Sequence, residues 1–219
     1  MKGVAKRAPK PQPVREKARA MFRRAILDAA EEAFAASGFH GAHMQEIARR
    51  AGLAVGTIYN HFGQKEDVLL ALLEQRIDEM AEVLHPEKGD PKNYAEKLVV
   101  RLERVLAYRE KHAAFFALAV DLGVLGDTTP GAQQALGGRA LPQATRMRAV
   151  WLDLVDEGIA AKALAPLDRE LLAALLKSTL RTVARWSRDS GGSLSPSQVA
   201  RLMVDVFLKG LERRKKEKP

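Results

Sequence analysis

The sequence predicts an all-α fold of roughly nine helices, and three observations lead to this prediction. Apolar residues recur every three or four positions in most segments of the 219-residue chain, which is the period of an amphipathic helix. No segment shows convincing alternation of apolar and polar residues, the pattern of a half-buried strand. Hydrophobic residues make up 47% of the chain, which is enough to bury a sizeable core.

Residues 1–19 differ from the segment that follows them. They contain three prolines, many basic residues and almost no large apolar side chains, so they predict a flexible basic arm. A helical stripe begins at Met21 and continues through Phe22, Ile26 and Phe34. Gly38 is expected to end this helix as a left-handed cap.

Three further helices are expected over residues 44–51, 55–62 and 64–84. The last of these is long, and its apolar residues gather mostly on one side. The proline-containing segment 85–91 breaks the pattern.

The C-terminal part of the chain predicts five more helices, over residues 92–110, 113–122, 140–161, 168–188 and 195–212. Segment 123–138 holds five glycines, which predicts a long loop or a short frayed helix. Asp168 is the expected N-cap of the fourth of these helices. Ser195, Pro196 and Gln198 form a capping-box pattern at the start of the fifth.

Composition excludes several classes of protein. The chain has no cysteine, which excludes disulfides, thiol catalysis and cysteine-ligated metal sites. No apolar run approaches the 18 residues or more that a membrane helix needs, and the N-terminus lacks a signal-peptide apolar stretch. We therefore expect a soluble cytoplasmic protein without a membrane partner.

Positive charge is concentrated at one end. Residues 1–65 hold 12 basic and five acidic groups, whereas residues 66–208 hold 18 basic and 20 acidic groups. A basic first segment on a nearly neutral remainder favours a polyanionic partner at that end. The alternative is that the basic termini only aid solubility.

The segment from Met44 to Phe62 has the spacing of a helix-turn-helix. Ala48 provides a small residue where two helices cross, Gly52 permits the tight turn, and Ile58 returns an apolar side chain to the crossing. The second helix would enter the major groove of DNA. Its outward residues are Val55, Gly56, Thr57, Tyr59, Asn60 and His61. Asn60 is a residue type that pairs with adenine. The alternative is an ordinary helical hairpin.

The stretch G-F-x-G-A-H-M-Q-E-I-A-R-R-A-G-L-A-V-G-T-I-Y-N-H-F-G-Q-K-E-D-V-L resembles the signature of the tetracycline-repressor (TetR) family. The resemblance is specific over about residues 20–80, and beyond them it holds only in helix pattern and length. It implies an N-terminal three-helix DNA-binding domain over 20–80, joined by a connecting helix to a helical effector-binding and dimerisation domain over 81–219. It also implies a homodimeric, ligand-responsive transcriptional regulator.

The resemblance also suggests which residues contact DNA. In this chain they are His43, Gln45, Val55, Gly56, Tyr59, Asn60, His61 and Lys65. Arg23 lies just upstream and Thr57 lies on the same helix, and we include both. Two positions depart from the family pattern, which usually has Thr where this chain has His43 and Ser where it has Ala54. Alanine cannot cap a helix, and a lost cap costs about 0.5–2 kcal/mol.

The middle helices contain the candidate effector-binding residues. The resemblance implies an apolar pocket in this region, with a few polar groups that orient a small molecule. The candidate lining residues are Tyr108, His112, Phe115, Phe116, Met147 and Trp151. Arg146 and Asp121 are possible orienting groups. For each lining residue the alternative is ordinary core packing, and the sequence does not identify the effector.

The apolar residues of the last two helices cover a wider arc of the helix surface than one buried face requires. A wide apolar stripe can bury against its own domain on one side and against a partner on the other. We therefore expect residues 168–188 and 195–212 to pair with their copies in a four-helix dimer interface. Such a dimer could contact two half-sites of a palindromic double-stranded operator.

Neither catalysis nor metal binding is expected. The sequence contains no convincing arrangement of a nucleophile with a base and no phosphate-binding glycine motif, so no catalytic residue and no cofactor are predicted. His40 and His43 lie in a glycine-containing loop instead of on an ordered helix. The main prediction is a ligand-released homodimeric repressor. The alternatives are a basic protein that docks on anionic membrane surfaces and a non-specific nucleic-acid packager.

Overall fold

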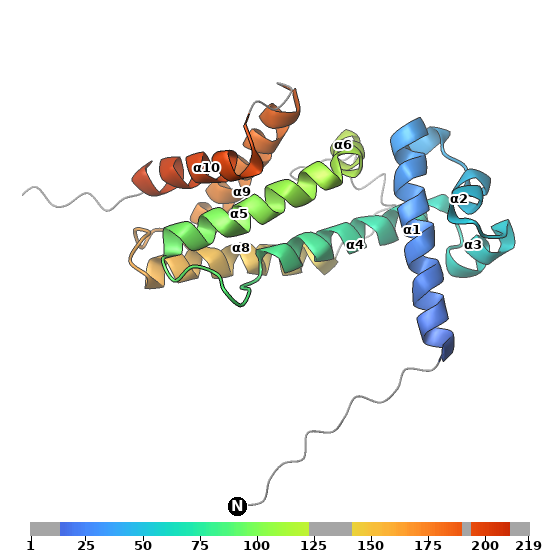
Figure 1. The fold of residues 1–219 in the computed structure, drawn as a ribbon, viewed down its shortest axis with the longest axis horizontal. Coiled ribbons are helices and arrows are strands. Elements are labelled where there is room, and N and C mark those ends of the chain that lie inside the picture. The colour runs from blue at the N-terminus through green and yellow to red at the C-terminus, as the bar shows by residue number, and fades with distance from the viewer. Residues whose placement is uncertain (1–13, 123–141, 190–193, 211–219) are drawn as a thin grey trace, which may run out of the picture. The chain divides into compact units, whose positions relative to one another are not determined.

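The structure, a computed structural model, describes residues 14–122, 142–189 and 194–210 (Figure 1). These residues form nine helices and no strands, as the sequence predicts. The helices are α1 (Val14–Gly41), α2 (Met44–Ala51), α3 (Val55–His61), α4 (Lys65–Leu84), α5 (Tyr94–Lys111), α6 (Ala113–Asp121), α8 (Pro142–Ala160), α9 (Arg169–Asp189) and α10 (Pro196–Gly210). The predicted loop 123–138 lies outside the described residues.

The chain divides into two compact units, Met1–Leu72 and Leu73–Pro219, which we call the N-terminal unit and the body. The N-terminal unit contains α1, α2, α3 and the start of α4. Its core is apolar, and the side chains of Ile26, Ile47, Ile58 and Leu69 are fully buried. Burial of such side chains stabilises a fold by about 1.5–3 kcal/mol each.

Helix α1 departs from prediction at both ends. It begins at Val14, so residues 14–19 of the predicted flexible arm are helical. Lys, Arg, Glu and Ala are good helix formers, and extending an existing helix costs little. Residues 1–13 lie outside the described residues. At Gly38, φ is 67° and ψ is 172°, so the helix is interrupted and this glycine is not in the predicted left-handed helical conformation. The helix resumes after Gly38 and ends at Gly41.

The body is organised around α5, which contacts α6, α8, α9 and α10 (Figure 1). The predicted caps of its last two helices are present. The Leu171 N–H donates to Asp168 at 2.9 Å. The Ser195 N–H donates to Gln198 at 2.8 Å, and the Gln198 N–H donates to the Ser195 hydroxyl at 3.3 Å. This reciprocal pair is a capping box.

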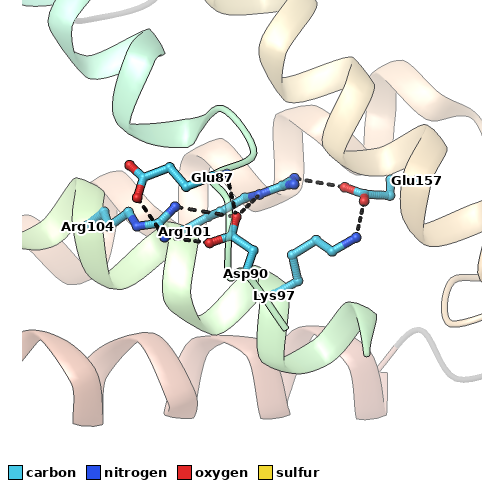
Figure 2. A network of polar contacts seen from close by, with 6 residues as sticks. All are labelled: Glu87, Asp90, Lys97, Arg101, Arg104 and Glu157. Carbon is cyan, nitrogen blue, oxygen red and sulfur yellow. Dashed lines mark hydrogen bonds and ion pairs between the residues drawn. The ribbon is translucent and has the colours of Figure 1, made fainter. Parts of the chain in front are cut away.

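A network of charged side chains joins the α4–α5 connection to α5 and α8 (Figure 2). Arg101 donates to Glu157 at 2.7 Å and lies 3.7 Å from Asp90. On the other side, Asp90 accepts a 2.5 Å bond from Arg104. Glu157 also accepts a bond from Lys97. The Arg101 side chain is only 4% exposed, so a guanidinium is held inside the body by carboxylates from two other segments.

Hydrogen bonds keep the carboxylates of Asp90 and Glu157 ionised. The bond from Arg104 lowers the pKa of Asp90 and outweighs the opposing effect of burial. Burial raises the pKa of Glu157, but hydrogen bonds from Lys97 and Arg101 outweigh it and leave the pKa below its ordinary value. The network therefore persists as paired charges near neutral pH.

Candidate nucleic-acid interface and effector region

Helices α2 and α3 form the predicted helix-turn-helix. Gly52 ends α2 in the left-handed helical conformation, with φ 65° and ψ 29°. The next residue, Leu53, donates its N–H to the Ala48 carbonyl at 3.0 Å. Ala48, Ile58 and Phe62 are buried at 1%, 0% and 7% exposure. The small residue, the turn glycine and the returning apolar residues therefore occupy the places that their spacing predicts.

Both helices of the motif begin without a side-chain cap. His43 precedes α2 in an extended conformation and makes no capping hydrogen bond with its side chain. Ala54 precedes α3, also in an extended conformation, and has no side-chain oxygen to offer. The first N–H groups of α2 and α3 therefore lack the side-chain acceptor that most helix starts have.

The candidate DNA-contacting residues of α3 lie on its accessible side. Tyr59 is 48% exposed, Gly56 and Asn60 are exposed, and Val55 and Thr57 are half-buried. His43 and Gln45, at the start of α2, are also exposed. Only Ile58 of α3 is fully buried. The helix therefore presents polar and small residues outward while one isoleucine anchors it.

Basic side chains of α1 lie beside the end of α3. The rings of Phe22 and His61 meet edge to face at 6.3 Å, and the Arg23 guanidinium lies 5.8 Å from the Phe62 ring centre. Burial lowers the pKa of His61, and the positive charges of Arg19 and Arg23 lower it further. Arg19 was not among the residues predicted to contact DNA. It lies four residues before Arg23, so both side chains are on the same face of α1.

Lys65 is the first residue of α4, and its side chain contacts the connection between α1 and α2. Its ammonium donates to the His40 carbonyl at 3.2 Å and to the Ala42 carbonyl at 2.9 Å. It also lies 4.7 Å from the centre of the Phe39 ring. Two of its three N–H donors are therefore engaged within the protein.

In the body, the six candidate effector-binding residues fall in two groups. Phe115, Phe116, Met147 and Trp151 are buried at 1%, 4%, 9% and 3% exposure. Tyr108 and His112 are half-buried, and their ring centres lie 4.7 Å apart. The Tyr108 ring also meets Phe116 edge to face at 6.1 Å. Tyr108, His112, Phe115 and Phe116 thus form one aromatic group where α5 meets α6.

Tyr108 connects this aromatic group to α4. Its hydroxyl donates to Glu79 at 2.7 Å, and the same carboxylate oxygen accepts a 2.7 Å bond from the buried Arg76. Burial raises the pKa of Tyr108, and so does its bond to the Glu79 carboxylate. Burial also raises the pKa of Glu79, but its hydrogen bonds outweigh this effect and lower the pKa overall. The phenol therefore remains a donor to a charged partner.

The suggested orienting groups are placed differently from the aromatic group. Arg146 is exposed and pairs with Asp78 and Glu82 of α4, the first at 2.8 Å. Its guanidinium is therefore occupied at the surface of the body. The side chain of Asp121 lies outside the described residues.

Helices α9 and α10 each bury one apolar face and expose another. Leu172, Leu176 and Leu180 of α9 are buried, and so are Val199, Met203 and Phe207 of α10. The exposed apolar side chains are Leu171 at 54%, Leu175 at 44%, Trp186 at 47%, Leu202 at 56% and Val206 at 62%. We call these five residues the apolar face of α9 and α10.

The described residues contain neither a metal-binding cluster nor a membrane-spanning helix. Within residues 14–122, 142–189 and 194–210, no three His, Asp or Glu side chains are grouped so that they could hold a metal ion. Among the same residues, no helix is long and apolar enough to span a bilayer.

Two family models match the chain. The model described as bacterial regulatory proteins, tetR family, matches residues 26–72, which include the helix-turn-helix. The model described as the tetracyclin repressor-like C-terminal domain matches residues 92–211. Together they match most of the described helices.

Known proteins agree with these matches. The chain is 34% identical over 79 residues to the fatty acid metabolism regulator protein of Bacillus subtilis, a match that covers 36% of this chain and 41% of that protein. It is 25% identical over 187 residues to the transcriptional repressor KstR2 of Mycobacterium tuberculosis, covering 85% and 90% of the two chains.

The fold agrees as well. The structure of FadR from Bacillus subtilis in complex with stearoyl-CoA superposes with a TM-score of 0.70 at 20% identity, over 85% of this chain and 98% of that one. The family model for the C-terminal domain alone spans more than half of the 219 residues. The chain therefore belongs to the tetR family of bacterial regulatory proteins, and it is a DNA-binding transcriptional regulator and not an enzyme.

Proposed function

We propose that this protein is a cytoplasmic homodimeric repressor that binds a palindromic operator and is released from it by a small amphiphilic effector. The observation that carries this proposal is the exposed polar side of α3, anchored by the fully buried Ile58. We assign DNA binding to residues 20–80, and effector binding and dimerisation to residues 81–219. Family membership does not favour the alternatives, a membrane-docking protein or a non-specific nucleic-acid packager.

The proposed operator contacts divide by chemistry. Asn60 and Gln45 are the candidates for base edges, because their amides both donate and accept hydrogen bonds. Tyr59, His61 and Arg23 are candidates for phosphates, which fix the register of a protein on the duplex. The remaining predicted contacts are Lys65, a further candidate for phosphate, and His43, Val55, Gly56 and Thr57, which are candidates for sugar, phosphate or a thymine methyl group.

The apolar face of α9 and α10 is the proposed dimer interface. Its five large side chains lie on helices that also bury a separate apolar face inside the body, formed by Leu172, Leu176 and Leu180 of α9 and by Val199, Met203 and Phe207 of α10. Large exposed apolar surfaces on a protein often mark a protein–protein contact. A two-fold axis would place the same face of both copies in contact.

The proposed effector is a fatty acyl-CoA or a molecule of similar amphiphilic character. One relative is named as a fatty acid metabolism regulator, and the FadR structure contains stearoyl-CoA. The aromatic group at the junction of α5 and α6 supplies apolar surface suited to an acyl chain. Within that group Tyr108 supplies the link to α4 through Glu79, by which a ligand could favour one position of α4 over another.

Selection of bound duplexes from a random DNA pool at about 150 mM salt tests the proposal. We expect enrichment of a two-fold symmetric site, and Tyr59→Ala and Asn60→Ala should each weaken binding to it. With six to ten phosphate contacts, affinity should fall about 10³–10⁵-fold between 50 and 200 mM salt. Unchanged affinity in both variants would overturn the assignment of α3, and binding without sequence preference would favour a packager.

Stearoyl-CoA is the first effector to test, added to the complex with the selected duplex. Release of the duplex supports the proposed effector class. Free CoA is the matched control, because it carries the nucleotide and the thiol but no acyl chain. Equal release by both compounds would show that the acyl chain is not what the protein recognises.

A further inference from the structure

The first turns of α1 lie outside the core of the N-terminal unit. Ile26 is the first fully buried side chain of the helix, and none of the side chains of residues 16–25 is buried. Met21 and Phe22 are 73% and 42% exposed. In Figure 1 these turns extend past α2 and α3. They therefore add little to the core and present most of their surface to solvent.

Two side chains connect this part of α1 to the end of α3. Phe22 meets the ring of His61 edge to face, with 6.3 Å between the ring centres, and the Arg23 guanidinium lies 5.8 Å from the centre of the Phe62 ring. Edge-to-face aromatic pairs and cations over aromatic faces are both attractive. These contacts therefore fix which face of α1 is turned toward the end of α3.

Positive charge is concentrated on that face. Arg19 is four residues before Arg23 and shares its face of α1. Burial lowers the pKa of His61, and the charges of Arg19 and Arg23 lower it further, which agrees with their placement near the imidazole. On the other side of the helix Arg24 pairs with Asp28. Within the described part of the chain, neither Arg19 nor Arg23 forms an ion pair with a carboxylate.

The way in which α3 would enter the operator indicates what this positive group meets. A recognition helix enters the major groove with its N-terminal end first, so its early residues contact base edges. His61 is the last residue of α3, so the basic group lies at the end of the helix that is farther from the bases. The phosphate backbone borders the groove at that end. Arginine suits such a contact, because its guanidinium can donate two hydrogen bonds to one phosphate.

We propose that Arg19, Arg23 and His61 form one phosphate-binding site, in which the first turns of α1 supply both guanidinium groups. This inference rests on the proposed function, because its ligand is the backbone of the operator. It adds Arg19, from a segment that the sequence predicted to be a flexible arm, to the operator contacts. The surface that binds DNA therefore extends from the helix-turn-helix onto α1.

The same helix provides a matched control. Lys17 is two residues before Arg19 and carries the same charge, but two residues turn an α-helix by about 200°, so the two side chains lie on opposite faces. Both are exposed. Arginine, lysine and methionine have similar helix propensities. Arg19→Met and Lys17→Met therefore remove the same charge from the same helix with little effect on its folding.

Fluorescence anisotropy measures the affinity for the selected duplex between 50 and 300 mM salt. Arg19→Met should weaken binding about tenfold or more, because a charge-assisted hydrogen bond is lost in each protomer. It should also reduce the magnitude of the slope of log affinity against log salt by about 0.9 for each protomer. Lys17→Met should change the affinity less than about twofold and leave the slope unchanged, because salt screens charges that lie more than about 10 Å from the phosphates.

A second measurement separates a phosphate contact from a residue that only positions α3. Phosphate contacts carry no sequence information, so Arg19→Met should weaken binding to the selected duplex and to a scrambled duplex by the same factor. Asn60→Ala, at a proposed base contact, should weaken binding mainly to the selected duplex. Circular dichroism at the temperature of the assay checks that each variant is folded.

Three outcomes would overturn the inference. Equal losses in Arg19→Met and Lys17→Met would show that only the net charge of α1 matters. An unchanged slope in Arg19→Met would show that Arg19 contacts no phosphate, and a loss confined to the selected duplex would identify it as a positioning residue. In each of these cases a loss of affinity in Asn60→Ala would leave the proposed function intact. Failure of the unsubstituted protein to select any duplex would contradict the proposed function instead.

Discussion

The N-terminal unit and the body hold their charged side chains in different ways. In the N-terminal unit the core is apolar, and Glu46 of α2 pairs with Arg49 and Arg50 of the same helix, while Arg50 also lies 3.4 Å from Glu32 of α1. In the body, Arg76 and Arg101 are buried at 5% and 3% exposure. Arg101 pairs with residues 11 and 56 positions away in the sequence. The N-terminal unit thus keeps its ion pairs near the surface, whereas the body holds two arginine side chains inside.

The largest expected effect is a loss of stability of the body, with the stability of the N-terminal unit unchanged. Arg101→Met leaves Asp90 and Glu157 each with one cationic partner fewer, and losing one partner of a buried pair costs about 3–5 kcal/mol. Both tryptophans, Trp151 and Trp186, belong to the body. Urea unfolding followed by tryptophan fluorescence therefore reports on the body alone.

The control for this substitution is Arg148→Met. Arg148 also pairs with a carboxylate, Glu170, but its side chain is 63% exposed, and such pairs contribute about 0–1 kcal/mol. Equal loss of stability in the two variants would show that burial of Arg101 is not what makes its pairing important.

The next effect separates dimerisation from folding. Leu202→Glu places a charge on the apolar face of α9 and α10, where Leu202 is 56% exposed in one chain. Burying an unpaired charge at the centre of an interface should raise the dimer dissociation constant about 30-fold or more. Sedimentation velocity measures this constant. Lys111→Glu, on an exposed residue of α5, should leave it unchanged.

A smaller effect should strengthen the N-terminal unit. Ala54 has the extended conformation of an N-cap, with φ −65° and ψ 141°, but no capping oxygen. Ala54→Ser supplies one and should stabilise the unit by about 1 kcal/mol. Hydrogen exchange of the α3 amides should slow, and Ala54→Val, which adds bulk without an oxygen, should not slow it. Faster exchange in the serine variant would contradict the expectation.

The smallest effect concerns pH. Burial and the charges of Arg19 and Arg23 lower the pKa of His61 below its ordinary 6.5. As pH falls below 6.5, the unfolded chain binds this proton before the folded one does, so the stability of the N-terminal unit decreases. A nearby phosphate would raise the pKa again, so operator affinity should increase over the same pH range.

This increase is limited to one proton for each protomer, or at most tenfold per pH unit for each half-site. Anisotropy titrations between pH 7.5 and 5.5 measure it. In His61→Asn the increase should disappear, whereas in His85→Asn, where the histidine is exposed in the body, it should remain. If the operator affinity of the unsubstituted protein does not change with pH, no phosphate lies beside His61 in the complex.

Local patterns in the sequence predicted the fold and several of its details. The all-α class, the turn at Gly52 and the capping box of Ser195 and Gln198 depend on residues within one turn of each other, and the structure confirms all three. The missing caps at His43 and Ala54 were visible in the same way.

Contacts between distant segments could not be predicted. Nothing local to Arg101 indicates that Asp90 and Glu157 will meet it, because their positions depend on how the α4–α5 connection and α8 pack on α5. The contacts of Lys65 could not be predicted either, because its carbonyl partners are 25 and 23 residues away and are known only once the path of the backbone is known. The contacts of the operator and the effector remain predictions.

The charged network of the body also has a thermal consequence. Hydration of ions becomes less favourable as temperature rises, so the cost of holding Arg101 and its partners away from water decreases on warming. The apolar core of the N-terminal unit gains no such benefit. Heating should therefore melt the two units in sequence, with the helix-turn-helix lost first and the α5–α8 assembly last. A population of folded bodies that has lost DNA binding would then exist just below the main melting transition.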